Sequence, residues 1–286
     1  MIRRTTMIKK MFIAFLGFIL LSNAAHAGIA DSLSTFFNKP LPAAKDTLKI
    51  LITHNKPGAM LEVKGKYKIY DPHTNKHIST RFIGKKKYIQ PLSEGLKWQE
   101  EFPGLYQLMI LPDDKATTII VDGIEYKGRI YIYDIGGTIS IVNEIPFDEY
   151  VKTILAARLQ APLPGEALAA VAIAARTNAY YLKQKAPSDY WDVEAKQIGY
   201  QGYALSPPSK LIEQAVKATH HMVMTFSSSP LMAKWDSIEA IDGGHAQVIH
   251  SKISLDQAAM LAHQGEHAAQ ILKKAFPGAQ IDLIAN

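Results

Sequence analysis

Charged side chains that could act on a substrate are spread through the second half of the chain. Glu149, Glu194 and Asp242 carry carboxyl groups that could protonate a leaving oxygen as a general acid. Glu149 stands at the start of a predicted helix, whereas Glu194 and Asp242 fall in predicted loops that could reach a cleft. Arg158 and Arg176 cannot supply this proton, because a guanidinium is effectively always protonated. We expect each arginine either to contact a bound ligand or to pair with a neighbouring acid.

Two predicted helices position most of these groups. Pro146 suits the first turn of a helix, and Phe147, Val151 and Ile154 then recur at helical spacing. Arg158 is the next residue on this apolar face. The buried face of a second helix is predicted from residues that recur at alternating gaps of four and three, namely Leu168, Ala172, Ala175, Ala179 and Leu182. Its many alanines would allow another backbone to come close.

The residues before these helices have the pattern of β-structure. Short β-branched and aromatic runs, divided by Pro, Gly, Asn and Asp, occupy residues 48–52, 67–70, 106–111, 117–121 and 129–133. Residues 122–123 (DG) and 136–137 (GG) are hairpin-type turns. We therefore predict an α+β protein. An N-terminal antiparallel part over residues 46–142, a small barrel or sandwich, packs against a helical part over residues 143–286.

The first 27 residues are predicted to be an export signal. They contain a basic start, an apolar run over residues 11–21, and the small residues Ala25 and Ala27 of a cleavage site. The run is shorter than the roughly 20 residues of an ordinary spanning helix, and its retention as an uncleaved anchor is the alternative. Residues 28–45 are predicted to be a linker. We expect a periplasmic or secreted protein with no stable membrane span after cleavage.

The composition argues against several classes of protein. The formal net charge of +6 falls to +2 without residues 1–27, which hold four basic residues and no acid, so nucleic-acid binding loses its main support. The dense basic cluster at residues 85–87 is either a solvated loop or a contact for anionic envelope polymers. The chain has no cysteine, Walker loop, dinucleotide fingerprint or nucleophile elbow. We expect no cofactor and no metal ion.

Several short motifs resemble the SpoIID/LytB family, whose members process peptidoglycan. Residues 147–150 (FDEY) resemble its acidic pair before tyrosine, and residues 164–177 resemble its P-x-E-A-L…A-A-R-T pattern. Residues 200–202 (YQG) resemble its Y-x-G step, and residues 243–244 its glycine pair. The resemblance runs from about residue 49 to the end and is weakest in the N-terminal third. The chain thus resembles a divergent member of this family, with one SpoIID/LytB-like domain over residues 46–286.

The resemblance implies an envelope protein that acts on peptidoglycan glycan strands as a lytic transglycosylase. In such an enzyme a carboxylic acid protonates the oxygen between N-acetylmuramic acid and N-acetylglucosamine. The family's acid lies in an A-E-M-like step at the end of the first helix, and residues 156–159 here read AARL. Arg158 therefore stands at the acid's position. A general acid contributes about a hundredfold to ten-thousandfold in rate, so we expect weakened or lost catalysis with glycan binding retained.

The resemblance also implies which side chains would contact the glycan. These are Tyr150, Arg158, Arg176, Tyr200, Gln201, His245 and Ser254. Aromatic rings with a polar rim suit stacking on sugars, although aromatic residues more often pack in a core. Ser254 belongs to a C-terminal pattern in which this chain lacks the glutamine that directly follows the serine.

Two other functions are compatible with the sequence. An active transglycosylase could use a relocated acid, for which Glu149, Glu194 and Asp242 are the candidates. An acid at a helix start, such as Glu149, is ordinarily explained by the helix dipole. An envelope adaptor could instead use the former sugar groove for a protein partner, and an apolar exposed cleft would favour that function.

Overall fold

The structure, a computed structural model, describes residues 46–159, 161–203, 207–227, 229–230, 232–235 and 248–284. The predicted export signal and linker, Asp242, the glycine pair at residues 243–244 and His245 lie outside these residues. Their assignments stay predictions. Within the described residues, no helix is both long and apolar enough to cross a bilayer.

The N-terminal part is built from strands, as the sequence pattern predicts. In chain order they are β1 (Thr47–Lys56), β2 (Ala59–Lys64), β3 (Tyr67–Asp71), β4 (Lys76–Arg81), β5 (Gly84–Leu92), β6 (Gly95–Trp98), β7 (Glu100–Pro103), β8 (Gln107–Pro112), β9 (Thr118–Val121), β10 (Ile124–Tyr126), β11 (Arg129–Asp134) and β12 (Ile139–Pro146). The predicted turns at residues 122–123 and 136–137 join β9 to β10 and β11 to β12.

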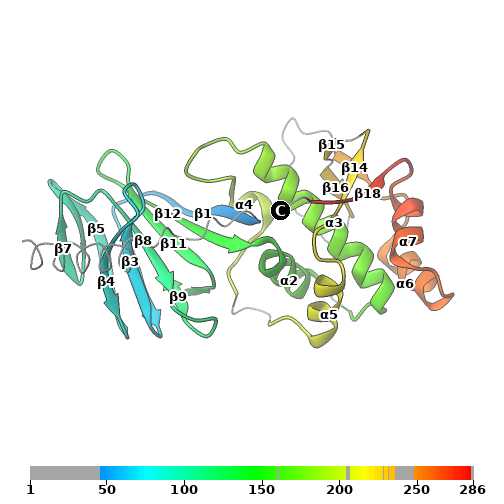
Figure 1. The fold of residues 1–286 in the computed structure, drawn as a ribbon, viewed down its shortest axis with the longest axis horizontal. Helices are drawn as coiled ribbons and strands as arrows, with labels where there is room; N and C mark the ends of the chain where they lie inside the picture. Colours follow the sequence, from blue (N-terminus) through cyan, green and yellow to red (C-terminus); the bar gives the residue numbers. More distant parts are fainter. Residues whose placement is uncertain are drawn as a thin grey trace, which may run out of the picture.

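These strands form two open sheets that pack against each other (Figure 1). Among the described residues, one sheet has the order β13-β1-β12-β11-β8-β3-β4, in which β13 is Val193–Glu194, and the other has the order β10-β9-β2-β5-β6-β7. The strands at the ends of each order have one neighbour, so neither sheet closes on itself. The sandwich alternative is confirmed, and the barrel alternative is wrong.

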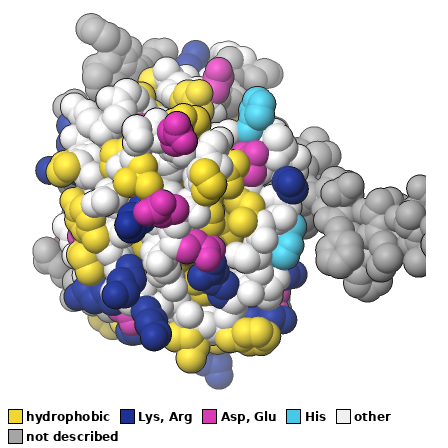
Figure 2. Space-filling model, turned by 90° about the vertical axis from the view of Figure 1, so that its left-hand side faces the viewer, with side chains coloured by type: hydrophobic (Ala, Val, Ile, Leu, Met, Phe, Trp, Pro, Cys, Tyr) yellow, Lys and Arg dark blue, Asp and Glu magenta, His cyan; other side chains and the backbone are white. Residues whose placement is uncertain are grey.

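The two faces of the first sheet differ in what they contact. Ile130 and Ile132 on β11 point into the core between the sheets. Tyr131 and Tyr133 alternate with them, as strand geometry requires, and belong to a smaller apolar cluster on the outer face. Figure 2 shows the end of the sandwich, where apolar, basic and acidic side chains are mixed over one face.

Two helices follow the sandwich, as predicted. They are α2 (Phe147–Arg158) and α3 (Gly165–Gln184), whose N-caps are Pro146 and Pro164. The residues predicted for the inward face of α2 are buried, namely Phe147, Val151, Ile154 and Leu155. The small residues of α3 are buried on most of its surface, which allows neighbouring elements to pack around it on several sides.

Shorter elements surround α3 (Figure 1). They are α4 (Ala195–Ile198), α5 (Lys210–Ala218), β14 (Met222–Phe226), β15 (Ser229–Pro230), β16 (Met232–Lys234), β17 (Val248–His250), α6 (Leu255–His263), α7 (Ala268–Ala275) and β18 (Gln280–Leu283). Ser209 caps α5, because its Oγ accepts a hydrogen bond from the Ile212 amide. The stretch at residues 191–203, predicted to be a loop, instead contains β13 and α4.

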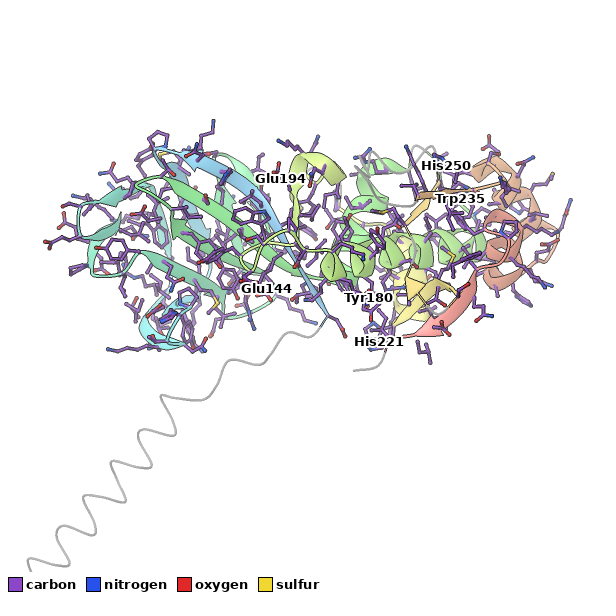
Figure 3. All side chains as sticks on the ribbon, turned by 90° about the horizontal axis from the view of Figure 1, so that it is seen from above. Glu144, Tyr180, Glu194, His221, Trp235 and His250 are labelled. Carbon is purple, nitrogen blue, oxygen red and sulfur yellow. The ribbon has the colours of Figure 1, made fainter. Side chains whose placement is uncertain are left out.

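β1 connects the sandwich to the helical part. It pairs antiparallel with β12 and parallel with β13. Lys183 Nζ on α3 donates to the Thr47 carbonyl at 2.6 Å. One apolar core runs from the sandwich into the helical part. The sandwich and the helical part lie end to end in the view from above (Figure 3).

Candidate functional site

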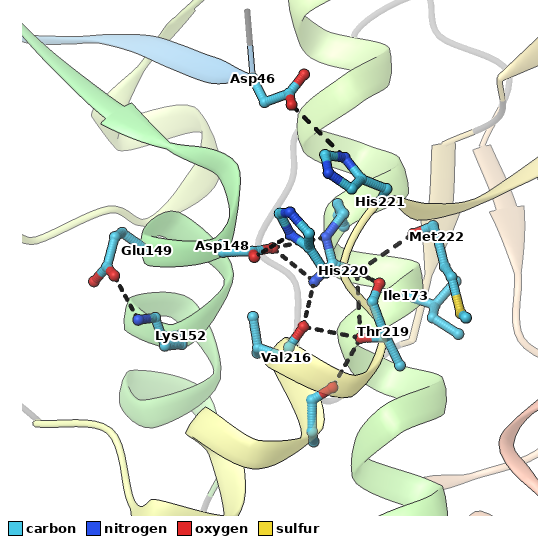
Figure 4. A network of polar contacts seen from close by, with 12 residues as sticks. Asp46, Asp148, Glu149, Lys152, Ile173, Val216, Thr219, His220, His221 and Met222 are labelled. Atoms are coloured by element: carbon cyan, nitrogen blue, oxygen red, sulfur yellow. Dashed lines mark hydrogen bonds and ion pairs between the residues drawn. The ribbon is translucent and has the colours of Figure 1, made fainter. Parts of the chain in front are cut away.

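An ion pair between the buried Arg176 and the half-buried Asp148, at the start of α2, links α2, α3 and α5 (Figure 4). Arg176 is 1% exposed, and its Nε and Nη2 atoms donate to Asp148 Oδ1 at 3.0 and 2.8 Å. Nη2 also donates to the Val216 carbonyl at 3.1 Å, and Nη1 donates to the carbonyls of Thr219 at 2.7 Å and Met222 at 3.3 Å. These carbonyls lie at or just beyond the C-terminal end of α5, where a helix lacks internal partners and its dipole is negative. Arg176 therefore caps α5 and neutralises Asp148.

This environment gives Arg176 a structural role. Burial lowers the pKa of its guanidinium from the ordinary value, and the nearby Asp148 carboxylate opposes that shift. A guanidinium has five N–H donors, and the contacts above use every nitrogen atom. The alternative that Arg176 pairs with a neighbouring acid is thus observed. Because its donors are used, we leave Arg176 out of the proposed ligand-binding surface.

Two histidines continue the network toward the surface. His220 Nδ1 lies 2.6 Å from Asp148 Oδ2, and His221 Nδ1 lies 3.7 Å from Asp46 Oδ2 (Figure 4). The two imidazole rings are in contact, with their centroids 3.6 Å apart and their planes tilted by 50°. Both Asp148 oxygens are therefore engaged. Within the described residues, no group of three or more His, Asp or Glu side chains is arranged to hold a metal ion.

A groove of about 550 Å³ lies where the outer face of the first sheet meets the start of α2. Glu144 lines it and lies at the boundary between sandwich and helices (Figure 3). This side chain is buried, and its carboxylate accepts hydrogen bonds from Thr47 Oγ1 and Tyr131 Oη, each at 2.8 Å. Arg129 Nη1 lies 3.4 Å from the same carboxylate. Glu144 on β12 thus has three donor groups around its carboxylate at the inner wall of the groove.

The chemistry of this groove suits binding more than proton transfer. Burial raises the pKa of the Tyr131 hydroxyl above its ordinary value, and the negative charge of Glu144 adds to the rise. Tyr131 is therefore a neutral donor to Glu144. The Glu144 carboxylate accepts hydrogen bonds from Thr47 and Tyr131, which gives it a structural role in this network. Polar groups at the rim, such as Glu149, can contact a ligand.

The other end of α2 holds Arg158 in a different environment. Its side chain is half-buried and lies against Gly199, where an added Cβ would meet Arg158 Nη2 at 1.7 Å. Its hydrogen bond to a described residue is long, 3.5 Å from Nη2 to the Ile198 carbonyl. Within the described part of the chain, Arg158 forms no ion pair with an acid. The guanidinium therefore lies on the short helix α4.

A hollow of about 210 Å³ beside this end of α2 is apolar. Its lining includes Leu155, Leu159, Leu163 and Leu168, with Leu211 from α5. The described residues that line it include no carboxyl group. Neither Arg158 nor any described acid lines this hollow.

Tyr150 and Tyr200 lie in the core. They are 3% and 4% exposed, and the Tyr200 ring lies 6.0 Å from Tyr126 and 6.2 Å from Tyr150 between centroids. Tyr200 Oη donates to Asn143 Oδ1 at 2.7 Å, and burial raises the pKa of this hydroxyl well above its ordinary value. Neither ring presents a face to a sugar in this arrangement, because each is covered by protein. Gln201 is exposed and can reach a ligand.

The chain matches a known protein family over the region that contains both ends of α2. Residues 136–226 match the family model described as stage II sporulation protein, SpoIID. This stretch is a SpoIID domain. It begins at the turn before β12 and ends with β14, so the resemblance inferred from short motifs is confirmed there.

Sequence relatives extend the similarity beyond the SpoIID domain. An uncharacterised protein of Chlamydia pneumoniae is 28% identical over 246 residues, which are 85% of this chain and 84% of that protein. One of Chlamydia muridarum is 27% identical over 263 residues, 91% of this chain and 84% of the relative. One of Brachyspira hyodysenteriae is 27% identical over 205 residues, 71% of this chain and 54% of the relative. Alignments of this length include strands of the sandwich as well as the SpoIID domain.

Two of the acids proposed as relocated catalysts, Glu149 and Glu194, are paired locally. Glu149 contacts Lys152 on the same turn of α2 within the SpoIID domain. Glu194 contacts Lys196 at 2.9 Å. Both pairs are partly exposed, so both carboxylates are accessible to solvent, and neither lines the hollow beside Arg158. Their proposed catalytic role stays a prediction.

Ser254 lies outside the SpoIID domain and caps α6. Its Oγ accepts from the Gln257 amide at 3.1 Å, and Gln257 Oε1 accepts from the Ser254 amide at 2.8 Å. This reciprocal arrangement is a capping box. Glu166 at the start of α3 similarly accepts from the Ala268 amide at 2.7 Å, at the start of α7. The geometry of Ser254 thus has a local structural explanation.

Sequence reasoning missed Glu144 and its partners in the SpoIID domain and the sandwich. A signal for Glu144 exists, because it is an acid within the apolar run at residues 139–145 (ISIVNEI), and a buried acid needs a partner. Arg129 has no comparable signal. It lies opposite Glu144 because of the register between β11 and β12, which the sequence pattern does not specify.

Proposed function

We propose that this protein binds the glycan strands of peptidoglycan in the bacterial envelope and has weakened or lost lytic transglycosylase activity. The SpoIID domain supports a function related to the cell wall. The observation that carries the proposal is Arg158, a half-buried arginine at the position where the family resemblance places the acid, with its guanidinium lying on Ile198 and Gly199. A guanidinium cannot protonate the leaving oxygen, so the first step of glycan cleavage has no donor there.

The groove at the start of α2 supports the binding half of the proposal. Its volume of about 550 Å³ falls in the range of ligand sites, roughly 300–1,000 Å³. Its lining combines charged groups, including Glu149 and Lys127, with apolar walls such as Leu111 and Pro146. Sugars present hydroxyl groups around apolar ring faces, so a lining of this mixed character matches them.

Purified protein incubated with isolated sacculi would test both halves. We expect co-sedimentation with sacculi and no anhydro-muropeptides by mass spectrometry. Absence of both binding and cleavage would remove the carbohydrate proposal. Cleavage by the unchanged protein would instead favour a relocated acid, which Glu149→Gln, Glu194→Gln and Asp242→Asn variants would identify through loss of product.

Arg158→Glu tests the missing acid directly. The matched control is Arg158→Gln, which removes the same guanidinium without adding a carboxyl group. If the cleft is otherwise competent, the glutamate variant should cleave at least about a hundredfold faster than the glutamine variant. A stable glutamate variant with no activity would show that the surrounding cleft has diverged as well.

The apolar hollow gives specific support to a second candidate, an envelope adaptor. Leu211 lines the hollow and is 51% exposed, so it is available to a protein partner. Leu211→Asp would separate the two candidates. Glycan binding at the groove predicts unchanged co-sedimentation with sacculi, whereas loss of localisation in cells with sacculus binding intact would favour the adaptor.

The proposal places the protein in the periplasm or outside the cell. It rests on the predicted signal over residues 1–27. N-terminal sequencing of the protein recovered from the envelope should begin at Gly28. An intact N-terminus in that fraction would favour the uncleaved anchor.

A further inference from the structure

The turn between β4 and β5 exposes two consecutive large apolar side chains. Phe82 is 70% exposed and Ile83 is 76% exposed, which places them among the most exposed large apolar residues of the described chain. Both neighbours of this pair in the chain are less exposed, because Arg81 is half-buried and Gly84 is buried. An exposed apolar pair of this kind does not contribute to the folded core, and contiguous apolar exposure commonly marks a contact surface.

Three lysines follow this apolar pair directly. Residues 85–87 are all exposed, and none forms an ion pair with a described residue. This part of β5 pairs with β2 on one side, whereas β6 pairs only with the later residues Gln90, Pro91 and Leu92. The lysines therefore lie along an open strand edge. Figure 2 shows Lys and Arg side chains gathered over the lower part of this end of the molecule, beside apolar side chains.

Two other basic residues near the apolar pair, Arg81 and Lys66, each form an ion pair with an acid. Arg81 pairs with Glu100, and Lys66 pairs with Asp113 at 2.8 Å. The Lys66 ammonium also lies 5.7 Å from the centre of the Phe82 ring. Residues 85–87 thus carry positive charge near the turn that no described acid pairs with.

We propose that this tip, residues 82–87, docks on the surface of an anionic lipid bilayer. Phe82 and Ile83 would enter the headgroup region, and the three lysines would bind lipid phosphates. A soluble anionic polymer would satisfy the lysines but leave both apolar side chains in water. A bilayer offers negative charge and an apolar phase within a few ångströms, which matches the two adjacent groups of side chains. None of residues 82–87 lines the groove at Glu144, so this proposal does not depend on glycan binding.

A fluorescent label would report insertion at the tip. Because the chain has no cysteine, Ile83→Cys can be labelled at one site with an environment-sensitive fluorophore. We expect a blue shift with vesicles of phosphatidylglycerol and phosphatidylcholine, and none with phosphatidylcholine alone. The control is His73→Cys, an exposed residue on the turn at the opposite end of β4, roughly 20 Å away, which should show no shift.

Charge and apolar variants separate the two contributions in vesicle co-sedimentation. Each lysine near an anionic surface contributes about 1 kcal/mol, so Lys85→Gln/Lys86→Gln/Lys87→Gln should weaken binding about a hundredfold. Phe82→Ser/Ile83→Ser should weaken it about tenfold, with unchanged thermal unfolding because both side chains are exposed. The matched control is Lys210→Gln/Lys217→Gln/Lys273→Gln, which removes the same charge from exposed positions of the helical part. All variants keep residues 1–45, so vesicle binding by the apolar run at residues 11–21 is common to them.

Three results would overturn the proposal. The first is an unshifted label at position 83 on bound protein, and the second is equal weakening by the tip and control lysine variants. The third is binding to inorganic polyphosphate that depends on residues 85–87, combined with vesicle binding that is insensitive to Phe82→Ser/Ile83→Ser. That last result would identify a site for a soluble polyanion. Sacculus co-sedimentation, measured on the same variants, reports the proposed glycan function independently.

Discussion

The two ends of α2 place charged groups in contrasting surroundings. At its start, Asp148 and Arg176 belong to a network in which every polar atom of both side chains has a partner. At its end, Arg158 makes one long hydrogen bond and lies against a glycine. Removing one member of a buried pair leaves an uncompensated charge, whereas a half-buried side chain with few partners is replaced at little cost. The fold of the SpoIID domain and the chemical identity of position 158 are therefore separable.

The largest expected effect is at Arg176. Arg176→Met leaves Asp148 and the carbonyls after α5 without their donor, and should lower the free energy of unfolding by about 3–5 kcal/mol. Arg158→Met, the same change at the other end of α2, should lower it by less than about 1 kcal/mol. Urea unfolding followed by circular dichroism measures both. Equal losses of unfolding free energy in the two variants would show that the two arginines do not differ in their contribution to stability.

Adjacent acids at the start of α2 sharpen the comparison. Asp148→Asn keeps the shape of the side chain but removes the charge that faces Arg176, and should cost about 1.5–3 kcal/mol. Glu149→Gln disrupts a partly exposed pair with Lys152 and should cost about 0–1 kcal/mol. Thermal or urea unfolding of the two variants gives the difference. A larger loss of stability for Glu149→Gln than for Asp148→Asn would show that the ion pair of Asp148 with Arg176 is not the more stabilising of the two.

A double-mutant cycle tests the contact at the end of α2. Gly199 has φ +60°, so Gly199→Ala should cost about 1–2 kcal/mol from backbone strain, and its Cβ would also displace the Arg158 guanidinium. In an Arg158→Ala background only the strain remains, which gives a coupling of about 0.5–1 kcal/mol between the positions. Additive effects would mean that the guanidinium does not lie on Gly199 in solution.

Asp192 provides a half-buried acid held by a backbone amide instead of a guanidinium. Its Oδ2 accepts from the Lys49 amide at 2.7 Å, and burial raises its pKa above 3.8 despite the lowering effects of that bond and of nearby lysines. The folded form thus holds this proton more tightly than the unfolded chain. Its contribution to stability is complete below pH 3.8 and is lost as the pH rises through the raised value.

Asp192→Asn should remove that pH dependence. Relative to the unchanged protein, the variant should gain stability as the pH rises from 3.8 toward neutrality. The measurement is urea unfolding at a series of pH values, with Asp189→Asn, a change in the same loop, as the control. A variant that loses stability relative to the unchanged protein over this interval would show that the charged form of Asp192 is favoured.

Periodicity predicted which faces are buried but not what lies against them. The apolar spacing of α2 and α3 identified both helices, and β-branched or aromatic runs identified five of the twelve strands from β1 to β12. The same spacing placed Arg158 inward but did not reveal that Gly199 would lie against it. Tyr200 could not be assigned to the core from the sequence, because its partners Asn143 and Tyr126 come from strands more than 50 residues earlier in the chain.

The position of β1 between β12 and β13 has a consequence for how the chain acquires its structure. Thr47 bonds to Glu144, 97 residues later, and Lys49 bonds to Asp192, 143 residues later. A strand made early in synthesis must wait for these distant partners, and such long-range pairing slows folding. A fragment limited to residues 136–226 would lack both β1 and β11 and leave both edges of β12 unpaired. The stretch that carries the family similarity is therefore not expected to fold on its own.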